Sequence, residues 1–309
     1  MTTTVQGVAP GPSDVVPADH ALLVLMALIW GVNFSVLKVG TRDVDPATFN
    51  GARVLLATAT LAIAAAVRRA RRPSPGDALR LVLLGMLGHG VYQLCFIEGL
   101  ARSESGTTAL ILAGGPAFIA IVGRMLGTER PTARAWGGIA LQVGGVAGVV
   151  LGAAAARPAG AQNTATGVLL VVAASLTWSV YAVLLRPLAT RVDGVQVAAW
   201  TLVGGALTIG AAAVPAIAHG ALGALSAAGW AAMGYSGVLA LSLAYLFYYR
   251  GVRTVGAVRT AMYTNLQPVV ALGVGSVALG ERPGGWQLAG AALIGAGLVA
   301  SRDGRRVRG

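Results

Sequence analysis

Charged and chemically reactive side chains are scarce in this sequence. Of the 309 residues 11% are charged, and the chain has three histidines and one cysteine. The single Cys95 leaves no disulfide within the chain, and the dispersed histidines provide no cluster of metal ligands. The sequence also has no Gly-x-x-x-x-Gly-Lys-Ser/Thr phosphate loop. We therefore expect no metal, no cofactor and no ATP hydrolysis.

One short motif raises the alternative of an enzyme. Residues 234–237 read Gly-Tyr-Ser-Gly, the pattern of an intramembrane serine protease nucleophile. Such a protease needs a histidine on a later helix, and no histidine follows His219. We therefore interpret the motif as close packing of small residues and expect no catalytic site.

Long apolar runs are abundant. Hydrophobic residues make up 56% of the chain and its mean hydropathy is +0.73, far outside the range of soluble proteins. Each run has about the 17 to 25 residues that a tilted helix needs to cross a bilayer. The pattern predicts an all-α membrane protein with ten transmembrane helices, at residues 21–39, 47–67, 78–100, 106–126, 135–152, 166–188, 195–217, 226–249, 256–279 and 285–300.

The net charge of +12 is almost entirely arginine, with Lys38 as the only lysine. In a soluble protein this charge would suggest nucleic acid, but here it indicates topology. If the N-terminus is cytoplasmic, the inner loops and tail carry 17 arginines and the outer loops carry five basic residues. This asymmetry predicts that both termini are cytoplasmic, with the lipid bilayer and not nucleic acid as the partner.

One segment of the chain occurs a second time in similar form. The segment Gly99–Gly145 returns 152 residues later, without a gap. At this offset Pro116 falls on Pro268, and the Glu-Arg-Pro of residues 129–131 falls on residues 281–283. The chain is therefore interpreted as a duplication.

The duplication defines the predicted organisation. A disordered tail (residues 1–20) that lacks the basic residues of a signal peptide precedes a first five-helix repeat (21–152). A linker (153–165), a second five-helix repeat (166–301) and a basic cytoplasmic tail (302–309) follow. Because each repeat has an odd number of crossings, the second should enter the membrane in the opposite direction. Inverted repeats allow outward-open and inward-open states of similar energy, which favours a transporter that works by alternating access.

A family resemblance rests on two motifs and this overall plan. Residues 28–34 read Leu-Ile-Trp-Gly-Val-Asn-Phe in the first helix, and residues 280–283 read Gly-Glu-Arg-Pro before the last helix. Together with ten apolar segments in two copies, the chain resembles the EamA-type branch of the drug/metabolite transporter superfamily, and within it bacterial exporters of amino acids, including aromatic ones. The resemblance implies export of small metabolites across the bacterial inner membrane.

Polar and aromatic residues inside the predicted helices are candidates for a substrate cavity, because an unpartnered polar group facing lipid is costly. Trp30 and Asn33 have the same spacing in the first helix as Trp178 and Tyr181 in the sixth. The alternative for each residue is an ordinary helix–helix contact. The predicted cavity residues are Trp30, Asn33, His89, Tyr92, Gln93, Trp178, Tyr181, Tyr245, Tyr263 and Gln267.

Two prolines lie inside predicted helices at matching places in the copies. Pro116 and Pro268 should each free a backbone carbonyl four residues earlier, at Leu112 and Thr264. We interpret both as candidate hinges, with a static kink as the alternative.

Few charges fall within the predicted spans. Arg53 and Glu98 lie at similar predicted depth near the outer side, which suggests either a structural ion pair or an outer gate. Glu129 and Glu281 lie in turns and are expected to cap the helices that follow them.

The sequence has few residues that could couple transport to an energy source such as a proton gradient. The first helix has no carboxylate of the kind that small multidrug exporters use to exchange protons for cations, and a relay through His89 competes with a core role for that residue. We therefore expect facilitated export of amino acids, with proton-coupled multidrug efflux as the alternative. Ten helices in one chain are sufficient to enclose a substrate path. A monomer is therefore sufficient, and a dimer is kept as the alternative.

Overall fold

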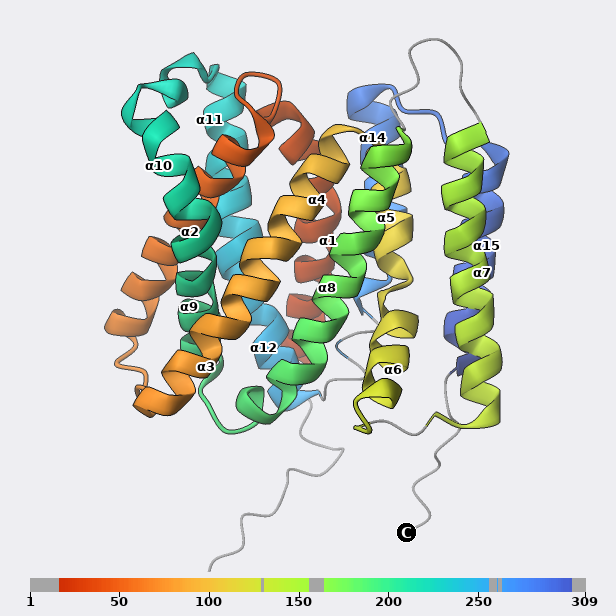
Figure 1. The fold of residues 1–309 in the computed structure, drawn as a ribbon, viewed down its shortest axis with the longest axis horizontal. Coiled ribbons are helices and arrows are strands. Elements are labelled where there is room, and N and C mark those ends of the chain that lie inside the picture. Colours follow the sequence, from red (N-terminus) through yellow and green to blue (C-terminus); the bar gives the residue numbers. More distant parts are fainter. Residues whose placement is uncertain (1–16, 129–130, 156–163, 256–259, 261–262, 302–309) are drawn as a thin grey trace, which may run out of the picture.

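The computed structural model describes residues 17–128, 131–155, 164–255, 260 and 263–301, and all of the regular structure in these residues is helical (Figure 1). The first copy begins at Pro17, inside the segment predicted as a tail. Its helices are α1 (Pro17–Gly40), α2 (Pro46–Val67), α3 (Pro75–Gly85), the π-helical turn η1 (Met86–Val91), α4 (Tyr92–Ala101), α5 (Ser105–Ala113), α6 (Gly115–Met125) and α7 (Ala133–Ala155).

The second copy repeats this order. Its helices are α8 (Ala165–Ala189), α9 (Gly194–Gly205), π-helical η2 (Ala206–Gly210), α10 (Ala211–Ala218), 3₁₀ η3 (Ala221–Ala224), α11 (Ala227–Gly234), π-helical η4 (Tyr235–Leu243), α12 (Ala244–Thr254), α14 (Gln267–Leu279) and α15 (Gly285–Ser301). The predicted linker is shortened by the end of α7 and the start of α8. Residues 156–163 between them, the tail 302–309 and Glu129 lie outside the described residues.

Eight helical stretches are long and apolar enough to cross a membrane. They correspond to the first eight predicted crossings, and consecutive elements such as α3, η1 and α4 form one crossing at Pro75–Ala101. The last two predicted crossings correspond to the shorter apolar helices Gln267–Leu279 and Gly285–Ala300. The membrane fold is therefore confirmed, whereas the count of ten stays a prediction.

Large apolar side chains cover the outside of the bundle. Ile63, Leu151 and Val277 are 65%, 68% and 90% exposed, a distribution that would be unfavourable in water. In a bilayer these side chains contact lipid tails, so the outside of the fold is as apolar as its inside.

Helices α7 and α15 are equivalent members of the two copies and lie side by side at one edge of the bundle (Figure 1). They run antiparallel, because Gly138 approaches Gly297 and Gly145 approaches Gly290. A Cβ atom on Gly145 would lie 2.8 Å from the Gly290 carbonyl oxygen. Glycines therefore allow the two backbones to touch, which is how helices associate in lipid without a hydrophobic driving force.

A second close contact sets the wall behind the cavity described below. A Cβ atom on Gly85 would lie 2.0 Å from the Thr201 carbonyl oxygen, and one on Gly205 would lie 2.8 Å from the Cβ of His89. The π-helical turns η1 and η2 lie at this contact. The glycines bring the third and seventh crossings together and bury His89 between them.

Glu281 caps a helix, but not the helix that was predicted. Its carboxylate accepts hydrogen bonds from the backbone N–H groups of Ser105 (2.9 Å) and Gly106 (3.4 Å), at the start of α5 in the other copy. It also forms an ion pair of 3.2 Å with Lys38 of α1. The cap therefore joins the copies, because a carboxylate is favourable at a helix N-terminus whichever chain segment supplies it.

We predict that Gly145→Ala destabilises the fold and that Gly144→Ala does not. The new methyl group on Gly145 meets the α15 backbone, whereas a Cβ on Gly144 meets nothing within 4 Å. The first change should lower the free energy of unfolding by about 1–3 kcal/mol through overpacking. The second should leave it unchanged or raise it slightly, because alanine favours helix.

The measurement is thermal loss of helicity of both variants purified in the same detergent. Equal melting temperatures for the two variants would contradict the close backbone contact between α7 and α15.

Candidate functional site

A cavity of about 180 Å³ lies between the copies, near the middle of the bundle. Helices of both copies contribute to its wall, mainly through aromatic and amide side chains. Its lining residues are Trp30, Asn33, Phe34, Arg53, Tyr92, Gln93, Phe96, Leu112, Gly115, Pro116, Ile119, Ser175, Trp178, Ala240, Leu241, Tyr245, Tyr248, Thr264 and Gln267.

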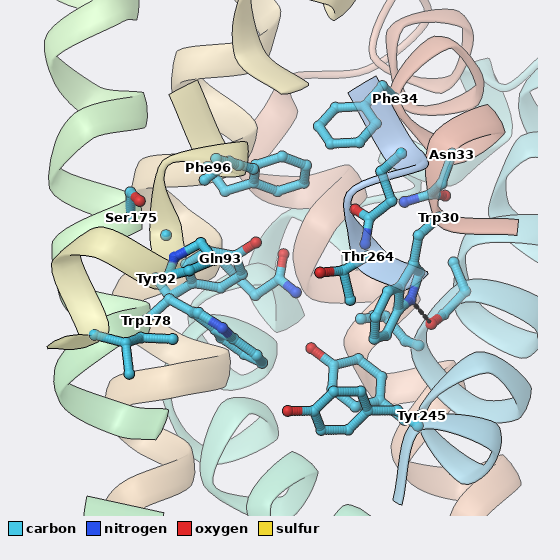
Figure 2. A pocket seen from close by; sticks show the side chains of 18 of the residues that line it. Trp30, Asn33, Phe34, Tyr92, Gln93, Phe96, Ser175, Trp178, Tyr245 and Thr264 are labelled. Atoms are coloured by element: carbon cyan, nitrogen blue, oxygen red, sulfur yellow. Dashed lines mark hydrogen bonds between the residues drawn. The ribbon is translucent and has the colours of Figure 1, made fainter. Parts of the chain in front are cut away.

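Most of the predicted cavity residues lie in this wall. Figure 2 shows Trp30 and Asn33 of α1 on one side and Tyr92, Gln93 and Trp178 on the other, with Tyr245 between the two groups. Gln267 also lines the cavity. Both tryptophans of the repeated spacing therefore face one space, from equivalent helices of the two copies.

Three predicted residues lie elsewhere. His89 is buried behind the wall, with its ring 5.3 Å from that of Tyr245 and 5.7 Å from that of Tyr181. Tyr181 is also buried, and its hydroxyl lies 3.4 Å from that of Tyr249. Tyr263 contacts the start of α1, where its hydroxyl lies 2.5 Å from His20 Nδ1.

Ring contacts fix the shape of the wall. The ring centroids of Trp30 and Tyr245 lie 5.2 Å apart and those of Tyr92 and Trp178 lie 5.1 Å apart. Trp30 Nε1 donates a hydrogen bond of 2.9 Å to the Ala240 carbonyl oxygen, which is drawn in Figure 2. The indole is thereby held with its polar atom satisfied and its ring face toward the cavity.

Several lining residues were missed, and helical spacing could have indicated some of them. Ser175 lies three residues before Trp178, and Tyr248 lies three after Tyr245. Residues three apart share a helix face. By contrast, Leu241 and Ile119 have no feature that separates them from the other apolar residues of their helices.

Both candidate hinges coincide with interruptions of a helix. The first interruption separates α5 from α6 at Gly114, and Pro116 is the second residue of α6. In the second copy, turn residues 265–266 precede α14, and Pro268 is its second residue. Proline is well tolerated in the first turn of a helix, where its missing N–H costs little.

Residues beside each interruption line the cavity, including Leu112 and Pro116 in one copy and Thr264 and Gln267 in the other. Irregular backbone at membrane depth is tolerated where it lines a cavity. The interruptions therefore lie where the two copies meet around a shared space.

Arg53 and Glu98 do not form the predicted pair. Arg53 donates hydrogen bonds of 2.7 Å each to Asn50 Oδ1 and Gln93 Oε1, whereas Glu98 pairs with Arg102, four residues later. Arg53 lines the cavity and Glu98 does not. A near neighbour on the same helix has satisfied Glu98, which explains why similar depth alone did not bring the two together.

Three lining side chains retain unused hydrogen-bonding capacity. Asn33 Oδ1, Ser175 Oγ and Arg53 Nη1 are buried and have no hydrogen-bond partner in the described part of the chain. The cavity therefore offers an acceptor, a hydroxyl and a cationic donor within an otherwise aromatic wall. A small molecule with both polar ends and apolar surface complements this arrangement.

The fold and the cavity define a multi-pass membrane transporter of small metabolites. The chain belongs to the EamA-like transporter family, which matches residues 20–151 and 165–302, one match for each copy. This is a family of transporters and not of enzymes. The serine of the protease-like motif, Ser236, is fully buried and its hydroxyl lies 3.4 Å from the Met233 carbonyl oxygen.

The names of similar proteins agree with the family. A probable terminal-alkyne amino-acid exporter of Streptantibioticus cattleyicolor is 31% identical over 278 residues, covering 90% of this chain and 91% of that protein. A probable amino-acid metabolite efflux pump of Salmonella typhimurium is 28% identical, covering 94% and 96%. An uncharacterized inner membrane transporter of Escherichia coli K12, YedA, is 25% identical, covering 87% and 85%. This chain is accordingly a multi-pass inner membrane protein.

A solved crystal structure shares the fold. The alignment covers 92% of this chain and 98% of the chain in that structure. Its TM-score is 0.62, and the two sequences are 20% identical.

We predict that a cysteine at position 175 can be reached from water and one at position 179 cannot. Both serines are buried, but Ser175 lines the cavity, whereas Ser179, one turn further along α8, does not and donates to the Ser175 carbonyl oxygen at 2.7 Å. In a Cys95→Ser background, a small water-soluble thiol reagent should modify Ser175→Cys faster than Ser179→Cys by about an order of magnitude.

The measurement is the mass shift of each purified variant with time. Equal rates would show that the cavity is closed to water or that its wall is placed differently.

Proposed function

We propose that this transporter exports amino acids or closely related metabolites down their own gradient, by alternating access of the central cavity. The observation that carries the proposal is the cavity wall, which combines aromatic faces with amides such as Asn33 and Gln267 and includes no carboxylate among its lining residues. A zwitterion needs polar partners for both of its ends and an apolar surface for its side chain. The names of two relatives, a probable amino-acid exporter and a probable amino-acid metabolite efflux pump, support the same substrate class.

Inverted topology supports alternating access. If the copies are inverted, with both termini cytoplasmic and ten crossings in all, equivalent helices must run in opposite directions. The antiparallel packing of α7 against α15 is what this arrangement requires. Because the cavity lies within one chain, a monomer is sufficient for transport.

Proton-coupled multidrug efflux is the alternative. A transporter of organic cations is expected to place a carboxylate in its cavity, and the described wall has none. His89, the residue considered for a proton relay, lies behind the wall and not in it. These two observations favour a facilitative mechanism.

Counterflow in proteoliposomes tests the proposed function. Labelled phenylalanine, threonine and methionine should each be tested with and without an imposed pH gradient, against liposomes without protein. We expect saturable counterflow of at least one amino acid at a rate that the gradient does not change. Movement of a cationic dye driven by the pH gradient, with no amino-acid flux, would instead support multidrug efflux.

The helix interruptions are proposed as hinges, and Pro268→Ala tests this role. Alanine allows a continuous helix through the interruption, so we expect counterflow to slow by about tenfold or more while thermal stability is kept or raised. Pro283→Ala is the matched control, because Pro283 is exposed in the turn before α15. Unchanged flux through Pro268→Ala would identify the interruption as static.

A further inference from the structure

Arg53 carries a charge inside a membrane crossing. It is 1% exposed and belongs to the first half of α2, which forms the second crossing. Its Nε and Nη2 atoms donate to the side-chain oxygens of Asn50 and Gln93, which are neutral, while Nη1 has no partner in the described residues. An arginine in a membrane interior is costly and normally faces a partner or a water-filled cavity.

The described residues supply no anion for this charge. Every acidic side chain among them bonds to another group: Glu98 pairs with Arg102, for example, and Glu281 with Lys38. The Asn50 side chain is itself held in place, since its Nδ2 donates to the backbone carbonyl oxygen of Gln93 at 2.9 Å. Arg53 is therefore positioned by neutral groups, lines the cavity, and has no acidic partner among the described residues.

We infer that Arg53 binds the carboxylate of the transported molecule. This inference rests on the proposed function and makes it more specific. A guanidinium recognises a carboxylate through charge-assisted hydrogen bonds, which are strongest where water is excluded. The Nη1 atom donates to one carboxylate oxygen, while Asn50 and Gln93 keep the side chain in a single orientation. The site therefore selects amino acids with a free α-carboxylate and rejects their amides, their esters and the corresponding amines.

The same charge disfavours cations as substrates. A cationic drug entering the cavity meets Arg53 without a counter-ion, whereas a zwitterion brings its own. The ammonium group of that zwitterion can bind to the side-chain oxygen Oδ1 of Asn33 and to the aromatic rings of Trp30 and Tyr245.

A competition series on the unaltered protein tests the inference. The amino acid with the strongest counterflow is used as the labelled substrate, and the competitors are the same amino acid, its amide and its decarboxylated amine. We expect the amide and the amine to compete about 30-fold or more weakly, because an arginine deprived of its buried anion loses a strong interaction. Equal competition by the amide would overturn the role of Arg53 and leave the proposed function standing. Absence of any amino-acid counterflow would overturn both.

Two variants then assign the preference to this residue. Arg53→Gln should lose the discrimination between the amino acid and its amide, and Arg53→Lys should keep much of it at reduced affinity, because the charge is retained. Thermal stability in detergent is measured for each variant, so that loss of fold is not mistaken for loss of binding. Arg80→Gln is the matched control, since Arg80 is exposed in the middle of α3 and does not line the cavity. Retained discrimination in a folded Arg53→Gln protein would contradict the inference.

Discussion

The middle of a bilayer provides no water, so each polar group there must find its partner within the protein. The helices satisfy their backbones, and hydroxyl groups such as those of Thr58 and Thr177 donate to carbonyl oxygens one turn earlier. Buried polar atoms without a partner among the described residues occur at several places, and three of them, on Asn33, Ser175 and Arg53, belong to residues that line the cavity. Under the proposed function, a transported molecule completes the hydrogen bonding of these three residues.

Much of the architecture could be predicted because it depends on local properties. A run of apolar residues is a membrane crossing wherever it packs, and the ungapped return of Pro116 at Pro268 reveals two copies without any knowledge of contacts. The large aromatic and amide residues of the cavity were predictable for the same reason, since few other roles suit Trp30 or Gln93 at that depth. His89 and Tyr181 were misplaced because the rotation of a helix is set by its neighbours, here through the close approach of Gly205 to His89.

The rest of the site depends on competition between partners, which a sequence does not display. Glu98 and Arg53 have suitable charges and similar depth, yet Glu98 has a nearer arginine one turn away. Arg53 therefore bonds to two neutral amides and lines the cavity. Because Arg53 and Glu98 do not pair, the positive charge of Arg53 remains at the cavity. Apolar lining residues such as Leu241 and Ile119 resemble the other apolar residues of their helices, so only the structure identifies them.

The cap supplied by Glu281 also bears on how the duplicated chain can change with time. Because this carboxylate completes the first turn of α5, a helix of the other copy, its identity is constrained by a partner encoded some 175 residues away. A substitution at Glu281 therefore alters the first turn of a helix in the other copy, so the two copies are not independent of each other at this point.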